Sequence, residues 1–246
     1  MQEYIRKELD INNIDNVDEV FEDVKNIMID WVWISKDVCL IIYYEYNLKK
    51  IIRFWFYDGE KLDYISKDLL YLKKIFKYNI ISFTVDWWLQ IASSIKSIYP
   101  EATIQRCLVH IHRQIISYIS RNPKTDCWKE LKKIVTFEWF KNPRKLIKQY
   151  NNWCRKWDVY LKEKSYWEKN WWYTHKKLRQ ARSHLKNALP YMFNYLEDPD
   201  ILSNTNILES INALIGNHIY NHRWLRKDRL ISFLSYWLYN RNYRKF

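Results

Sequence analysis

Apolar residues near the start of the chain occur in short runs separated by turn-forming residues. The runs at 26–34, 38–46 and 50–57 are divided by the tripeptides 35–37 and 47–49, which contain Ser, Asp, Asn and Lys. Short apolar runs with this turn chemistry are typical of antiparallel strands. We therefore expect three consecutive strands, with a carboxylate, Asp30, inside the first of them.

The pattern then changes to helical spacing. Between 62 and 77, apolar residues fall three or four positions apart, which predicts a helix that buries one face. A short apolar run at 80–85 ends at Asp86 and predicts a buried strand. A helix over 88–97, stopped by Pro100, and a fifth strand over 102–109 complete the order β-β-β-α-β-α-β.

The remaining pattern is helical. Residues 121–199 are basic and aromatic and lack strand alternation, so we expect an all-helical insertion there. Two further helices are expected over 207–220 and 229–239. The predicted class is α/β, and the predicted divisions are an N-terminal extension (1–25), a first core part (26–120), a helical insertion (121–200) and C-terminal helices that complete the core (201–246).

Charge adds information about partners. Lys and Arg number 41 against 28 Asp and Glu, which gives a net charge of +13. Such a surface attracts polyanions, so nucleic acid is the leading candidate partner. A biased genome that favours Lys is the alternative explanation. The N-terminus carries no signal-peptide pattern and the apolar runs are shorter than the roughly 18 residues of a membrane helix, so we expect a soluble cytoplasmic protein with no membrane partner.

Glycine is scarce and tryptophan abundant. The chain has 2 Gly and 14 Trp, although glycine makes up about 7% of a typical protein and supplies the positive φ angles that turns need. We therefore hypothesise that several Trp are glycines encoded by UGA, a codon that some bacteria read as Gly. A protein truly rich in Trp is the alternative.

Two carboxylates in the predicted strands are candidate ligands for divalent metal ions. Asp30 interrupts an apolar run, and Asp86 ends another. Phosphodiester chemistry by two divalent ions requires several carboxylates that converge on one pocket, because hard cations prefer oxygen ligands. Taken singly, each acid is equally explained as a strand-end residue that faces water.

Two motifs carry a family resemblance. The segment 100–113 (PEATIQRCLVHIHR) resembles the P-x-A-x-x-Q-R-C-x-V-H-x-x-R signature of Mutator-like transposases, in the class of bacterial insertion sequences. The segment 205–212 (TNILESIN) resembles the T-N-x-x-E-x-x-N helix of the same family. The resemblance extends over about residues 26–240.

This resemblance implies a fold and a site. It implies a ribonuclease H-like core, a mixed five-stranded sheet with flanking helices, and a DDE triad of Asp30, Asp86 and Glu209 that binds two Mg²⁺ or Mn²⁺ ions. Cys107 and His110 are expected to support the site, with no metal assigned to them. The family's Asp-Gly steps and its Arg-Gly step read Asp-Trp and Arg-Trp here, and the positions concerned are Trp31, Trp87 and Trp224.

The implied partner is double-stranded DNA, both element ends and target, bound by a homo-oligomer. Basic residues are interleaved with Trp153, Trp157, Trp167, Trp171 and Trp172 in the insertion, which suits contacts to the DNA backbone and stacking on unpaired bases. A solvated helical face over an aromatic core explains them equally well. The side chains expected to contact DNA are Arg106, His112, Arg113, Asn206 and Asn212, and for His112 a place in the core is the alternative.

Two alternatives to a complete transposase remain open. The first catalytic strand is expected within the first 30 residues, so a truncated, inactive DNA-binding relic is one alternative. A structure-selective nuclease of the same fold is the other alternative, because the carboxylates alone do not separate cleavage from strand transfer. The sequence does not specify the target site, the terminal repeats or the oligomeric state.

Overall fold

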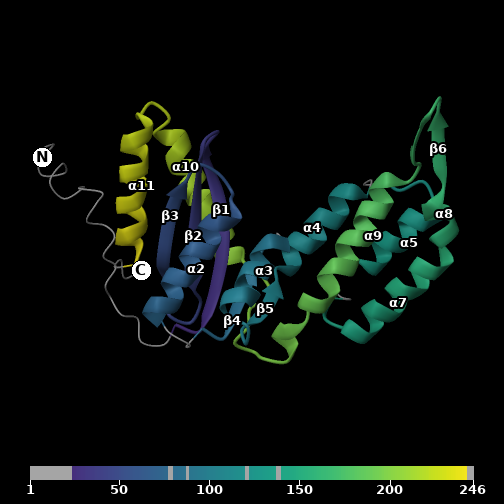
Figure 1. Ribbon diagram of the computed structural model, residues 1–246, viewed down its shortest axis with the longest axis horizontal. Coiled ribbons are helices and arrows are strands. Elements are labelled where there is room, and N and C mark those ends of the chain that lie inside the picture. Colours follow the sequence, from purple (N-terminus) through teal and green to yellow (C-terminus); the bar gives the residue numbers. More distant parts are fainter. Residues whose placement is uncertain (1–23, 77–79, 87–88, 120–121, 137–139, 243–246) are drawn as a thin grey trace, which may run out of the picture. The chain divides into compact units, whose positions relative to one another are not determined.

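A five-stranded mixed sheet with flanking helices confirms the predicted α/β class (Figure 1). The computed structural model describes residues 24–76, 80–86, 89–119, 122–136 and 140–242. The strand order is β3-β2-β1-β4-β5, in which β1 pairs antiparallel with β2 and parallel with β4. The strands are β1 (Asn26–Ser35), β2 (Val38–Glu45), β3 (Lys50–Tyr57), β4 (Ser82–Val85) and β5 (Thr103–Arg106).

Alternation along the strands gives the two faces of the sheet different partners. Tyr43 on β2 donates a hydrogen bond to Asp68 of helix α2 at 2.8 Å, so this position faces α2. Tyr43 pairs with Ile29 on β1, and the next pair, Asp30 with Ile42, points to the opposite face. Asp30 therefore faces away from α2.

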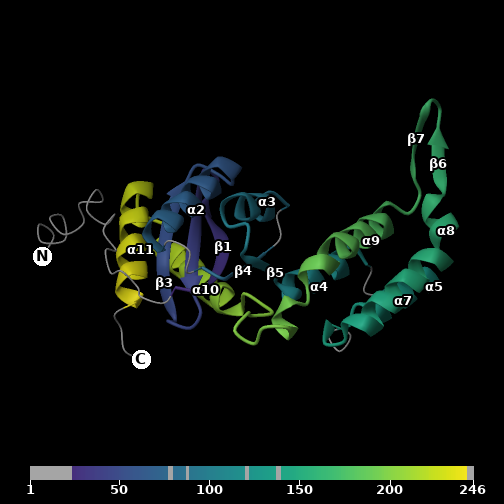
Figure 2. The same ribbon diagram turned by 60° about the horizontal axis from the view of Figure 1, so that its bottom comes forward.

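The helices of the sheet unit lie on both faces. Helices α2 and α3 pack against each other, α10 packs against β1, and α11 contacts both β3 and α10. Figures 1 and 2 show α2 and α10 on opposite faces of the sheet. The bounds are α2 (Leu62–Phe76), α3 (Leu89–Ile98), α10 (Asn206–Asn221) and α11 (Lys227–Arg241).

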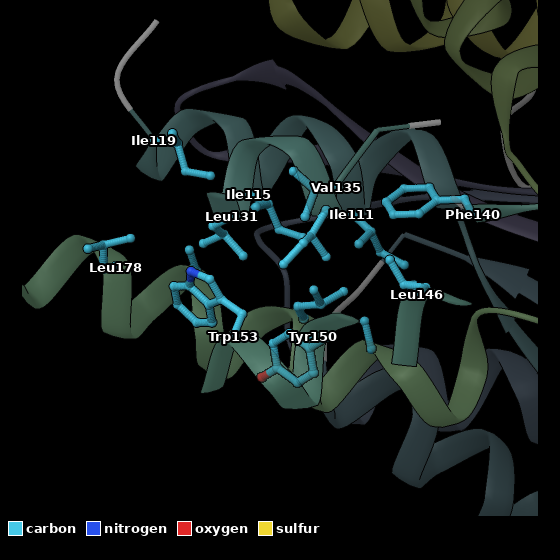
Figure 3. Close-up of a cluster of buried hydrophobic side chains, with 14 of the residues drawn as sticks. Ile111, Ile115, Ile119, Leu131, Val135, Phe140, Leu146, Tyr150, Trp153 and Leu178 are labelled. Atoms are coloured by element: carbon cyan, nitrogen blue, oxygen red, sulfur yellow. The ribbon is translucent and has the colours of Figure 1, made fainter. Parts of the chain in front are cut away.

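The chain divides into two compact units. The sheet and these helices form the first, Met1–Ile104 with Thr205–Phe246, and Gln105–Asn204 forms the second. The second unit has a core of its own, in which Tyr150 and Trp153 pack among aliphatic side chains (Figure 3). Its elements are α4 (Leu108–Tyr118), α5 (Asp126–Ile134), α7 (Pro143–Lys156), α8 (Asp158–Lys162), β6 (Lys164–Trp167), β7 (Asn170–Tyr173), α9 (Lys176–Ala188) and the 3₁₀ turns η2 (Leu189–Tyr191) and η3 (Asn194–Leu196).

Two predictions about the middle of the chain are wrong. The fifth strand was expected over 102–109, but it ends at Arg106, and α4 begins at Leu108. Leu108, Ile111 and Ile115 recur at helical spacing and are buried in the core of the second unit, which favours a helix over a longer strand. This helix belongs to the second compact unit, Gln105–Asn204.

The insertion is also not all helical. Strands β6 and β7 pair antiparallel from Lys164↔Tyr173 to Trp167↔Asn170. The two-residue connection at 168–169 places Glu168 at a φ of 52°, a left-handed conformation that closes tight hairpins. Five of the eight strand residues are aromatic, and aromatic residues favour strands.

The backbone φ angles relate to the hypothesis that several Trp are UGA-encoded glycines. Among the described residues other than Gly, the positive φ angles occur at Lys49 and Glu168, and not at Trp31 or Trp224. Trp87 lies outside the described residues. The described backbone therefore does not require glycine at the two positions that it covers. Of the predicted N-terminal extension, 1–25, only residues 24 and 25 are among the described residues.

The structure gives one finding about membranes. No helix in the part of the chain that the structure describes is long and apolar enough to cross a bilayer.

Candidate active site

Asp30 is a buried carboxylate in the central strand. It lies on β1, is 8% exposed and follows three buried apolar residues, Ile27–Ile29. Its Oδ1 accepts a hydrogen bond from the backbone N–H of Trp31 at 2.9 Å, and its Oδ2 accepts one from Nδ2 of Asn212 at 2.9 Å. Both carboxylate oxygens are thus held, which fixes the direction in which the group points.

Helix α10 supplies the second part of the site. Its buried face, Leu208, Ile211 and Ile215, packs the helix against the sheet, and Asn212 lies beside this face. Glu209 precedes Asn212 by three residues, a spacing that makes two side chains neighbours on a helix surface. Because Asn212 reaches Asp30, the half-buried Glu209 is positioned one turn away on the same side of the helix.

Strand pairing positions Asp86. Strands β1 and β4 run parallel from Asn26↔Ser82 to Ile29↔Val85, and a 2.6 Å hydrogen bond from Ser82 Oγ to Asn26 Oδ1 joins the first pair. Asp30 is the next residue on β1, and Asp86 directly follows the end of β4. Neighbouring strands lie about 4.8 Å apart, so this register brings the backbone of half-buried Asp86 next to Asp30.

The elements that carry the three acids therefore lie next to one another in the first unit. Their oxygen donors are of the type that Mg²⁺ and Mn²⁺ prefer. Across the residues that the structure describes, however, no three His, Cys, Asp or Glu side chains are grouped closely enough to hold a metal ion. The fold brings the elements that carry the acids together, and the side chains do not form a closed ligand cage.

Cys107 and His110 belong to the second unit. Cys107 is 1% exposed and is the residue before α4, where its carbonyl accepts a hydrogen bond from Ile111 N at 3.1 Å. His110 is half-buried on the first turn of the same helix. Residues two apart on a helix point in different directions, so His110 and His112 do not share one side of α4. A supporting role for the Cys–His pair stays a prediction.

The side chains expected to contact DNA differ in exposure. Arg113 and Asn206 are exposed, and His112 is half-buried. Arg106 is 1% exposed, so the structure does not support a DNA contact by its guanidinium. Its charge instead acts inside the second unit, where burial first and Arg106 second lower the pKa of His184 to about 4. Asn212 donates to Asp30, a role that the sequence did not predict.

A basic hollow was also missed by the sequence. It has a volume of about 770 Å³, is open to solvent, and is lined by His112 of α4 and by Lys129, Lys132 and Lys133 of α5, among others. Burial and the neighbouring Arg113 lower the pKa of His112, which favours its neutral form. The sequence placed Lys132 and Lys133 in a broad basic region, and helix packing is what joins them to His112.

The fold defines an α/β protein with a buried carboxylate in its central strand, and a family comparison identifies its class. The sequence profile described as "Transposase, Mutator family" matches residues 47–225, well over half of the chain. The chain belongs to the Mutator family of transposases. The match includes Asp86 and Glu209 and begins after Asp30. No curated protein matches the sequence. Transposases cleave and transfer DNA, so the family assignment implies DNA as the partner.

Proposed function

We propose that this chain is a DDE transposase core of ribonuclease H-like fold, in which Asp30, Asp86 and Glu209 support metal-dependent DNA hydrolysis and strand transfer. The observation that carries the proposal is the hydrogen bond from Asn212 to Asp30, which joins the central strand to the helix that bears Glu209. The strand order and the β1/β4 register supply the remaining support.

The donor set fits hard divalent cations, so Asp30, Asp86 and Glu209 are the residues that would hold them. Two bound Mg²⁺ or Mn²⁺ ions would activate the attacking water or DNA 3′-OH and stabilise the departing oxygen. The protein's own contribution is to fix the ligands. Asp30 is held by a backbone N–H and by Asn212, so little reorientation of this carboxylate is needed.

The second unit would supply contacts to the DNA backbone. The basic hollow carries three lysines, and exposed Arg113 follows His112 on α4. Lys129 also pairs with Asp126 at 3.3 Å, so part of its charge is balanced, and Lys132 and Lys133 line the same hollow. Phosphate contacts of this kind strengthen DNA binding without specifying a sequence.

A nicking assay tests the proposal. Purified protein is incubated with supercoiled plasmid in Mg²⁺, in Mn²⁺ and in EDTA, and nicked circles are measured. We expect metal-dependent nicking that Asp86→Asn and Glu209→Gln abolish. Asp63→Asn, a matched change of an exposed acid on α2, serves as the control and should nick as wild type does.

The same assay separates the alternatives. Absence of nicking by the wild-type protein, with DNA binding retained, would identify the inactive relic. If nicking occurs, an oligonucleotide with a free 3′-OH is added. Its joining to target DNA supports a transposase, whereas cleavage without joining would identify a nuclease.

A further inference from the structure

The β6–β7 hairpin of the second unit carries exposed aromatic side chains. It projects beyond the ends of α8 and α9 (Figures 1 and 2). Tyr166 is 70% exposed, Trp167 69%, Trp171 51% and Trp172 49%. Large exposed apolar groups that gather on one element mark an interaction site more often than a structural need.

Strand register divides these rings between two faces. Tyr166 lies opposite Trp171, and Lys164 lies opposite Tyr173, so these four side chains share one face. Two of its three rings, those of Trp171 and Tyr173, are already engaged. Lys164 Nζ lies 3.9 Å from the centroid of the Trp171 ring, and the Arg179 guanidinium lies 3.5 Å from that of Tyr173. This face of the hairpin is held by cations from its own unit.

The other face carries Trp167 and Trp172 together with Ser165 and Asn170. The two indoles are diagonal neighbours across the strand pair. Within the described part of the chain, neither indole has a ring or cation partner. Two flat rings on one face are thus open to a ligand.

The base of the hairpin is well anchored. Thr174 N donates to the carbonyl of Glu163 at 3.0 Å, and the Ser165 and Thr174 hydroxyls lie 2.8 Å apart. His175 bonds the Glu163 carboxylate at 2.9 Å and stacks on Tyr160 with ring centroids 3.7 Å apart. This anchoring lets the hairpin present its rings at a fixed place, which reduces the ordering cost of binding.

Charge identifies the kind of partner. Residues 158–182 contain seven Lys or Arg and three Asp or Glu, and Lys169 is exposed in the hairpin turn beside Trp167. Aromatic rings among cations match a nucleic-acid strand, whose bases stack and whose phosphates pair with Lys. The cores of protein interfaces are instead depleted in charge and in Lys.

We propose that the Trp167 and Trp172 face of the hairpin binds unpaired DNA by stacking on exposed bases. Indole rings stack on base faces only where the bases are unpaired, as in strands opened during DNA cleavage and transfer. The inference rests on the proposed function for the identity of the ligand. The opposite face, held by Lys164 and Arg179, stabilises the hairpin and does not stack on bases.

The test compares the two faces. Affinity for a fluorescein-labelled 20-nucleotide oligothymidine and for duplex DNA of the same length is measured by anisotropy in EDTA. We expect Trp167→Ala and Trp172→Ala each to weaken single-strand binding by about tenfold, within the range seen for loss of one base–aromatic stack. Trp172→Phe should keep most of the affinity. Trp171→Ala on the opposite face and Trp224→Ala in the first unit are controls that should change it little.

Each other outcome overturns the proposal. Equal losses in Trp171→Ala and Trp172→Ala would mean that the hairpin as a whole, and not this face, binds DNA. Unchanged DNA affinity with altered sedimentation in Trp167→Ala would identify a protein interface. Equal effects on duplex and single strand would exclude stacking. Because EDTA removes metal, failure of nicking would count against the proposed function and leave this result standing.

Discussion

Asn212 donates its side-chain N–H to the carboxylate of Asp30 at 2.9 Å, across 182 residues of sequence. The Oδ1 of the same amide is buried and has no hydrogen-bond partner among the described residues. A buried amide oxygen without a partner costs free energy, and the hydrogen bond from the same amide fixes the Asp30 carboxylate. We therefore regard Asn212 as a positioning residue for Asp30.

Removing this hydrogen bond should reduce catalysis more than binding. We expect Asn212→Ala to lower metal-dependent nicking by about 10- to 100-fold, as loss of a group that orients a metal ligand commonly does. Asn212→Asp should have a larger effect, because it places a second negative charge against Asp30. The control is Asn217→Ala, an exposed position on the same helix. Unchanged kcat with a raised KM for DNA in Asn212→Ala would indicate a DNA contact instead.

Asp68 should make folding stability depend on pH. Burial raises its pKa to about 7 from 3.8, although Tyr43 and Tyr57 donate hydrogen bonds to it. A raised pKa means that the folded state retains the proton, so the stabilisation is complete below pH 4 and is lost as the pH rises towards 7.

The size of this effect is on the order of 4 kcal/mol at most, from about three pKa units. We expect the free energy of unfolding, measured with urea from pH 4 to pH 8, to fall less steeply in Asp68→Asn than in wild type. Identical pH profiles for the two proteins would refute the assignment. Asp63→Asn, an exposed acid on the same helix, should keep the wild-type profile.

Tryptophan-to-glycine substitutions distinguish true tryptophans from recoded glycines. Trp153 is 2% exposed and donates from Nε1 to the carbonyl of Cys127 at 2.9 Å, so Trp153→Gly should destabilise the protein by more than about 3 kcal/mol. Trp224 is 74% exposed, and Trp224→Gly should change stability by less than about 1 kcal/mol. Peptide mass spectrometry of the protein from its host then reads the residues directly. Gly at position 153 would contradict the packing of this core.

The basic hollow should determine the salt dependence of duplex binding. Lys132→Ala and Lys133→Ala together should weaken binding to duplex DNA of any sequence and reduce the slope of log affinity against log salt by about 2. Lys61→Ala in the first unit, where Lys61 pairs with Asp58 at 2.7 Å, is the control. Loss of affinity for one sequence only would contradict a backbone contact.

Local patterns in the sequence predicted most of the sheet and its helices. The predicted run 50–57 is β3, and the predicted helix 62–77 is α2 to within one residue, because apolar periodicity reports which face is buried. Apolar periodicity did not predict the change from strand to helix at Cys107, because no Gly or Pro marks it. It also did not predict the β6–β7 hairpin, whose strands are too short to show alternation.

The sequence predicted which acids form the candidate site, but not how they are arranged in space. The family resemblance named Asp30, Asp86 and Glu209. The β1/β4 register and the position of α10 bring their elements together. The contact between Asn212 and Asp30 depends on the packing of a helix near one end of the chain on a strand near the other. Local sequence contains no signal for such a contact.

The second unit is inserted into the sequence of the first, and this fixes the order in which the three proposed ligands are synthesised. Asp30 and Asp86 leave the ribosome before residues 105–204, and Glu209 leaves after them. The inserted unit has its own hydrophobic core, so it can collapse while the sheet still lacks α10. A growing chain therefore holds only two of the three proposed ligands until α10 is made, so the proposed site can be completed only after the inserted unit has been synthesised.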